Sequence, residues 1–150
     1  MQTKKQDAIY KAIMEKVNTP DYFAARNDIF ITEVGMGFAK GRMNDTGKTK
    51  NHHGTHHGGA IATMMDTLCG TALFGLGKNR VTVHASIEYL RMAKGTIYGE
   101  ATVRKEGQSI CVCQVSLWDE TEKEVAIGTF SFCIIGDFNP EDILKESEQT

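Results

Sequence analysis

Apolar residues recur along the chain at two spacings, one typical of helices and the other of strands. Over residues 4–18 the spacing is helical, with apolar side chains at Ala8, Ile9, Ala12, Ile13 and Val17. We expect a short N-terminal helix with one buried stripe, ended by the Asn-Thr-Pro that follows. Residues 139–150 are mostly polar and predict a short helix or a frayed tail.

Strand-like patterns occupy much of the remaining chain. Apolar residues interleaved with glycines over residues 29–43 predict one long, bent strand. Four further strands are expected at residues 81–91, 96–105, 109–118 and 124–135. Because short connections join these four, we expect them to pair as an antiparallel meander in a five-stranded sheet.

Between the first and second predicted strands lies an apolar run, from Gly58 to Gly77, in which Asp66 is the only charged residue. This composition predicts a largely buried helix over residues 60–74, too short and too interrupted to span a bilayer. A buried, unpaired carboxylate is costly, and proteins that keep one often use it for function. Asp66 is therefore a candidate catalytic residue.

A His-Gly-Gly turn, His57 to Gly59, opens this helix. The first N–H groups of a helix have no helical partners, and the helix dipole favours negative charge at that end. Such an end can stabilise an oxyanion. The turn and Asp66 together indicate a catalytic site.

Composition narrows the class of protein. About 150 residues is the usual size of one domain, so we expect residues 1–150 to form a single unit. The net charge of −2 and the lack of a long basic run argue against a nucleic-acid partner. The N-terminus lacks the apolar core of a signal peptide, so we expect a soluble, cytoplasmic protein without a membrane partner. Four cysteines inside apolar segments are expected to be reduced core thiols.

A sheet with one unusually apolar helix has a direct packing solution, in which the sheet curls around the helix. This is an α+β arrangement, the hot-dog fold. Over residues 29–135 the chain resembles the hot-dog acyl-CoA thioesterases of the phenylacetic-acid-degradation (PaaI-like) type, in the 4-hydroxybenzoyl-CoA thioesterase superfamily. The resemblance rests on Asn51, His57-Gly58-Gly59, Asp66, Val81-Thr82-Val83, Tyr89-Leu90-Arg91 and Glu106-Gly107-Gln108-Ser109.

The resemblance implies a role for each matching residue. The Gly58 N–H would polarise the thioester carbonyl, His57 would support the turn, and Asn51 would position substrate or water. Asp66 would act as general base on water or as nucleophile, and Thr82 would help to hold the water or the acid. The residues alone do not separate the two roles of Asp66.

Helix geometry adds an argument about assembly. Asp66 lies eight residues beyond Gly58, which is about 12 Å along a helix axis. One thioester carbon cannot contact both residues of the same chain. We therefore expect a two-fold homodimer in which each Asp66 lies near the partner's Gly58. The resemblance implies in addition that two dimers associate as a homotetramer.

Coenzyme A carries phosphates, so basic side chains are expected near the mouth of the site. The candidate substrate- and CoA-binding residues are Gly59, Met65, Arg91, Lys94, Arg104, Lys105 and Gln108. Gln108 stands where the family has a basic residue, so the resemblance does not carry a charged phosphate contact over to this position.

No metal and no cofactor is expected, since coenzyme A is part of the substrate and the histidine spacing matches no metal site. Two alternatives to an acyl-CoA thioesterase remain. One is a hot-dog hydratase or dehydratase, and the other is a non-catalytic acyl-CoA-binding module. The acyl group stays open, because one methylene changes binding to a pocket by only about 1 to 3 kcal/mol.

Overall fold

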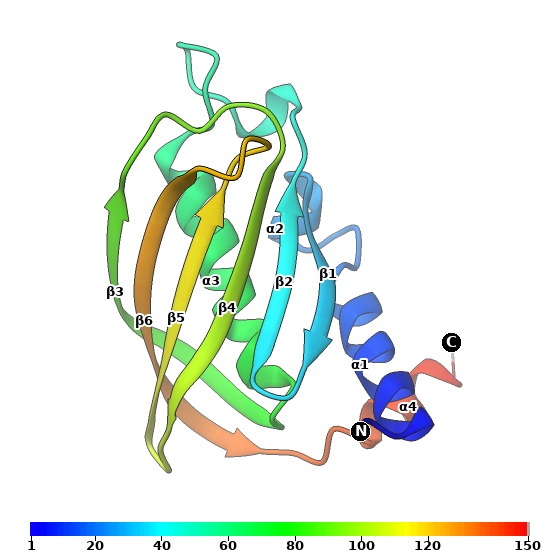
Figure 1. The fold of residues 1–150 in the computed structure, drawn as a ribbon. Coiled ribbons are helices and arrows are strands. Elements are labelled where there is room, and N and C mark those ends of the chain that lie inside the picture. The colour runs from blue at the N-terminus through cyan, green and yellow to red at the C-terminus, as the bar shows by residue number, and fades with distance from the viewer. Residues whose placement is uncertain (150) are drawn as a thin grey trace.

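The computed structural model describes residues 1–149 and contains a six-stranded antiparallel sheet that curls around one long helix (Figure 1). The helix is α3 (Gly58–Phe74). The order of the strands in the sheet is β1-β2-β4-β5-β6-β3. Their bounds are β1 Ile29–Gly35, β2 Phe38–Met43, β3 Lys78–Tyr89, β4 Ile97–Glu106, β5 Ile110–Trp118 and β6 Glu124–Asp137.

Short helices surround this core. The predicted N-terminal helix is α1 (Lys4–Val17), which begins with a capping box between Thr3 and Gln6 and packs beside β1. The predicted C-terminal helix is α4 (Asp142–Ser147), which lies against α1. A one-turn helix, α2 (Phe23–Arg26), and a 3-10 turn, η1 (Gly47–Thr49), complete the set.

The prediction of one long, bent strand over residues 29–43 is wrong. The segment forms a hairpin in which β1 pairs with β2 through a turn at Met36 and Gly37. Gly37 has a φ of +75°, which favours glycine, so it allows the chain to reverse there. The sheet consequently has six strands where five were expected, and α3 follows the second strand.

The expected four-strand meander is correct only for β4, β5 and β6. β3 does not pair with β4, which follows it in the chain. It pairs with β6 and forms the edge of the sheet. Residues 90–96 therefore do not form a hairpin loop. They pass from the edge strand β3 over the ends of β6 and β5 to β4, and on the way they contact the loop before α3.

Two glycines let α3 approach the sheet closely. Gly41 of β2 and Gly99 of β4 are paired directly, and Leu68 of α3 lies over both. A Cβ atom on Gly99 would lie 2.7 Å from Leu68 Cδ1 and 2.4 Å from Leu117 Cδ2. The helix surface fits into this depression, and Met64 and Leu68 are fully buried as a result.

The outer edge of β3 has no strand partner among residues 1–149. It carries large apolar side chains that remain in contact with solvent, with exposed fractions of 47% for Val81, 55% for Val83 and 55% for Tyr89. A long apolar edge strand is a template for pairing with another chain. This edge is therefore the strongest candidate for self-association on the described surface.

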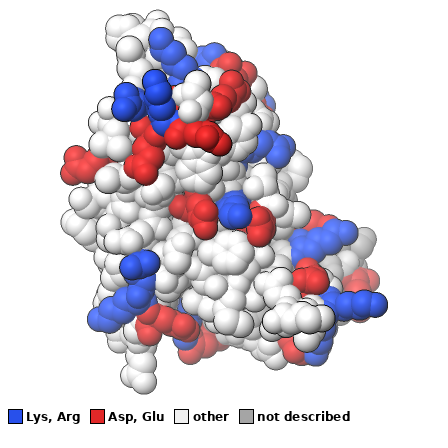
Figure 2. Space-filling view, in the orientation of Figure 1, with Lys and Arg blue, Asp and Glu red and all other residues white. Residues whose placement is uncertain are grey.

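The four cysteines are free, as predicted, and Cys69, Cys111 and Cys113 are buried. Cys133 was also expected in the core, but it is only half-buried. Figure 2 shows basic and acidic side chains interspersed over one face of the molecule, with no continuous basic field on that face. Within residues 1–149, no helix has both the length and the apolar character needed to cross a membrane.

Candidate active site

The first turn of α3 leaves one backbone donor free. His57 is the N-cap, and its Nδ1 accepts a hydrogen bond of 2.8 Å from the Gly59 N–H. The N–H groups of Ala60 and Ile61 both donate to the His57 carbonyl. Among residues 1–149 no acceptor is found for the Gly58 N–H, which lies on an exposed residue. The turn can therefore present this single N–H to a bound group.

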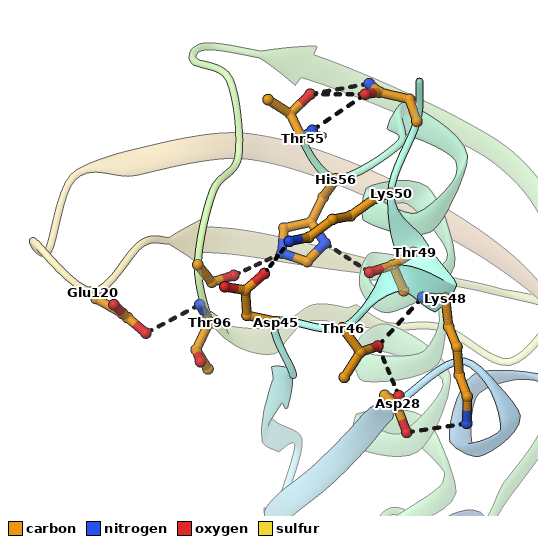
Figure 3. Close-up of polar contacts among 12 residues, drawn as sticks. Asp28, Asp45, Thr46, Lys48, Thr49, Lys50, Thr55, His56, Thr96 and Glu120 are labelled. Atoms are coloured by element: carbon orange, nitrogen blue, oxygen red, sulfur yellow. Dashed lines mark hydrogen bonds and ion pairs between the residues drawn. The ribbon is translucent and has the colours of Figure 1, made fainter. Parts of the chain in front are cut away.

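The loop before α3 is held by a buried histidine, His56, which is 5% exposed (Figure 3). One ring nitrogen, Nδ1, lies 2.7 Å from Thr49 Oγ1, and the other, Nε2, lies 2.6 Å from the Gly95 carbonyl. The His56 N–H also donates to the Ala93 carbonyl. These bonds join the loop, η1 and the 90–96 crossover, and they fix where α3 begins.

Asn51 mainly orders its own loop. Its Oδ1 accepts from the backbone N–H groups of His53 and Thr55, and its Nδ2 donates to Thr55 Oγ1 at 3.0 Å. The residue is half-buried and lines the same cavity as Gly58. The structure thus brings Asn51 to the predicted oxyanion site, with its side chain bound to the loop.

Asp66 lies in the middle of α3 and is half-buried, not buried as the apolar run predicted. The physical reason is the edge position of β3, whose outer side is open and leaves one face of the helix accessible. The Asp66 carboxylate is also not unpaired, since Thr82 Oγ1 of β3 donates to its Oδ1 at 2.7 Å. The structure therefore joins these two predicted residues directly.

Within one chain, Gly58 and Asp66 line different cavities. The Gly58 cavity, of about 430 Å³, is also lined by Asn51, Tyr89 and Arg91. The Asp66 cavity, of about 530 Å³, lies farther along α3, between the helix, α2 and the start of β3. Neither residue is found in the other's cavity, so one chain does not bring the two together.

Two residues of β3 that were not predicted to belong to the site, Tyr89 and Arg80, lie at these cavities. The Tyr89 hydroxyl donates to the Gly58 carbonyl at 3.1 Å, and its ring packs over Gly58. The Arg80 side chain lines the Asp66 cavity. Arg80 precedes Thr82 by two positions, and residues two apart in a strand share a face, so strand periodicity would have identified it.

The predicted CoA-binding residues fall into two groups at opposite ends of the sheet. Arg91 lines the Gly58 cavity, and Lys94 lies on the crossover that His56 contacts. Arg104, Lys105 and Gln108 lie at the hairpin between β4 and β5. The hairpin is nine residues along β4 from Ile97, which is roughly 30 Å at the usual rise of a strand.

The other two predicted binding residues also separate. Gly59 lies beside His57 in a third cavity of about 330 Å³, which borders η1. Met65 is fully buried in the core and lines neither the Gly58 cavity nor the Asp66 cavity. Its place in the core, against Gly128 of β6, gives it a packing role in this chain.

The histidine-rich loop does not assemble a metal site in the part of the chain that the structure describes, since no group of three or more His, Cys, Asp or Glu side chains converges. The His52 and His53 rings contact each other at the exposed tip of the loop, with centroids 3.8 Å apart. The His56 and His57 rings are used in the contacts described above.

Comparisons with known proteins identify the family of this chain. A model of the thioesterase superfamily matches residues 53–126, which span the His-Gly-Gly turn, α3 and the strands β3, β4 and β5. Acyl-coenzyme A thioesterase PaaI of Escherichia coli K12 is 30% identical over 101 residues, which cover 66% of this chain and 72% of PaaI.

Solved structures extend the likeness to the fold. The E. coli PaaI structure has a TM-score of 0.80 at 24% identity and covers 89% of this chain and 98% of that chain. A Streptococcus mutans UA159 protein solved with acetyl-CoA bound has a TM-score of 0.71 at 26% identity, over 74% of this chain and 91% of that chain. These similarities confirm the predicted hot-dog fold.

Because His56 is buried and bonded on both ring nitrogens, His56→Ala is expected to lower the free energy of unfolding by about 1–3 kcal/mol. Chemical denaturation of the purified protein measures this difference. His53→Ala is the matched control, since His53 is exposed and its change should stay within about 0.5 kcal/mol. Equal effects of the two substitutions would contradict the role given to His56.

Proposed function

The chain belongs to the thioesterase superfamily and is a thioester hydrolase, and from this premise we propose that it hydrolyses acyl-CoA thioesters at a site built by two copies of the chain. The observation that carries the proposal is the free Gly58 N–H at the start of α3, together with the Asp66–Thr82 pair one cavity away. The likeness to PaaI and to a structure with bound acetyl-CoA supports coenzyme A as the thiol.

In the proposed reaction, the Gly58 N–H donates to the thioester carbonyl oxygen and stabilises the negative charge that develops there. The positive end of the helix dipole acts in the same direction. Asp66 accepts a proton from water, whose oxygen bonds to the acyl carbon. The carbon–sulfur bond then breaks, and the proton passes to the CoA sulfur, which gives the free acid and CoA. The reaction as proposed uses no cofactor and no metal.

Asp66 has a second route, in which its carboxylate attacks the acyl carbon and water then hydrolyses the mixed anhydride. Thr82 supports either route, because its hydroxyl donates to one carboxylate oxygen of Asp66 and holds the side chain at the cavity that Asp66 lines. His57 supports the turn by taking the Gly59 N–H as its partner. The Gly58 N–H is thereby reserved for substrate.

The two halves of the site must come from different chains. In one chain Gly58 and Asp66 are about 12 Å apart along a rigid helix and open into separate cavities. A homodimer solves this problem if two α3 helices lie antiparallel, so that each Asp66 faces the partner subunit's Gly58. This arrangement gives two composite sites related by a two-fold axis.

The exposed edge of β3 provides the interface for this dimer. Thr82 contacts Asp66 and Tyr89 contacts Gly58, so β3 spans both halves of the site. If two β3 strands pair antiparallel about an axis near Ala85, Thr82 of one chain lies opposite Tyr89 of the partner subunit. The apolar side chains at this edge would then be buried.

The same symmetry explains how basic side chains at opposite ends of the sheet could serve one CoA molecule. In a two-fold dimer one end of a chain lies beside the opposite end of its partner. Arg91 and Lys94 of one chain and the hairpin with Arg104 and Lys105 of the other are then candidates for the two phosphate-bearing parts of CoA. Association of two dimers as a tetramer, implied by the family resemblance, remains a prediction.

Asp66→Asn tests the proposal through free-thiol release from a panel of short, aromatic and long acyl-CoA esters. We expect hydrolysis of some esters by the unaltered protein and a loss of about a hundredfold or more in the variant, as for removal of a general base or nucleophile. Asp7→Asn, an exposed acid on α1, is the matched control. Binding of acyl-CoA without hydrolysis would replace the proposal with a non-catalytic binding module.

Gly58→Pro tests the oxyanion donor, because proline removes the N–H while keeping helical backbone angles. Proline is well tolerated at the first position of a helix, and His57 already has the extended conformation that it requires (φ −63°, ψ 140°). We expect kcat to fall by about 10²–10³-fold.

Gly58→Ala is the control for this variant, because it keeps the N–H. Its Cβ would lie 3.5 Å from Tyr89, an ordinary contact, and its kcat should fall far less than that of Gly58→Pro. Equal losses in the two variants, both folded by circular dichroism, would show that bulk at residue 58 matters and that its N–H does not.

A further inference from the structure

The Asp66 cavity is lined by a basic side chain, Arg80, that packs closely against α3. Arg80 extends from the start of β3 across α3, with its Nη2 2.9 Å from the position that a Cβ on Gly70 would occupy. Its guanidinium lies over the Phe74 ring, 5.3 Å from the centroid. Only a glycine at position 70 leaves room for this side chain, so Arg80 can lie directly against the surface of α3.

The guanidinium has no hydrogen-bonded or ion-paired partner in the described part of the chain, although it carries five N–H donors. Thr82, and not Arg80, holds the Asp66 carboxylate. Lys16, the other cation lining this cavity, is instead paired with Glu146. Burial lowers the pKa of Arg80, and the nearby charge of Asp66 opposes that effect.

Arg80 and Asp66 lie along one face of α3. Gly70, which Arg80 contacts, follows Asp66 by four residues, or one helical turn of about 6 Å. A thioester at Asp66 whose acyl group extends along this cavity would reach the guanidinium. The intervening walls are largely apolar and include Phe74, Val81 and Phe132.

From this arrangement we propose that Arg80 is a specificity residue which selects short acyl groups that end in a carboxylate. The apolar walls would contact the methylenes, and the planar guanidinium would bind the terminal carboxylate through two parallel hydrogen bonds. The inference rests on the proposed function, because it takes the Asp66 cavity as the acyl-binding part of the site. It adds the substrate class, which the family likeness leaves open.

The test compares two acyl-CoA esters of equal chain length, glutaryl-CoA and pentanoyl-CoA, which differ by a terminal carboxylate. The unaltered protein is expected to have a higher kcat/KM for glutaryl-CoA. In Arg80→Met the ratio of the two kcat/KM values should fall tenfold or more, about 1.4 kcal/mol. Arg80→Lys, which keeps the charge but not the planar fork, should retain part of the preference.

Lys16→Met is the matched control, since it removes the other cation of the cavity, and its ratio should match that of the unaltered protein. A preference for pentanoyl-CoA, or a ratio that Arg80→Met leaves unchanged, would overturn the inference. An equal fall for both esters would likewise overturn it, since Arg80 would then serve the reaction of every substrate. Thermal melting checks that each variant is folded.

A binding measurement distinguishes failure of the proposed function from failure of this inference. If neither ester is hydrolysed, the affinities of both esters, measured by calorimetry on the unaltered protein and on Arg80→Met, still test the inference. Tighter binding of glutaryl-CoA that Arg80→Met abolishes supports Arg80 as a carboxylate-binding residue in a protein without turnover. Equal affinities for the two esters overturn it.

Discussion

The rigidity of one helix is the constraint on which the rest of the structure depends. α3 carries the free N–H of Gly58 at its start and the Asp66 carboxylate two turns later, and a helix cannot bend enough to bring them together. Each group has its own supports, His57 and Tyr89 for the first and Thr82 for the second. The chain therefore holds these two groups in separate places, and the proposed dimer would bring one of each into a single site.

The sheet is adapted to this helix. The Gly41–Gly99 pair lets α3 sink into the sheet, and burial of its inner face anchors the helix in the core. The opposite face stays accessible because β3 is an edge strand. The accessibility of Asp66 and the unpaired apolar edge of β3 thus both result from the position of β3 at the edge of the sheet. In one chain this edge is a liability, and in the proposed dimer it becomes the interface that assembles the site.

Much of this was predictable from local pattern. The apolar run with one acid identified α3, and the His-Gly-Gly turn identified its N-terminus, because both signals depend on neighbouring residues only. The Gly35–Gly37 hairpin was missed because glycines within a strand are compatible with a bulge as well as a turn. The edge position of β3 was missed because a connection such as residues 90–96 has the length of a hairpin loop whether or not it crosses the sheet. The half-burial of Asp66 follows from that tertiary pairing, which no local pattern encodes. Arg80 was missed for a different reason, because the predicted strand began at residue 81 whereas β3 begins at Lys78.

The shared site is the central claim, and mixing two inactive chains tests it most directly. Asp66→Asn chains and Gly58→Pro chains are unfolded together, refolded and assayed for thiol release. In a mixed dimer one site carries both substitutions and the other carries neither, so random pairing should restore about a quarter of the original activity. A mixture no more active than its two components, with mixed dimers shown to be present by native mass spectrometry, would place Gly58 and Asp66 of one chain in the same site and contradict the account.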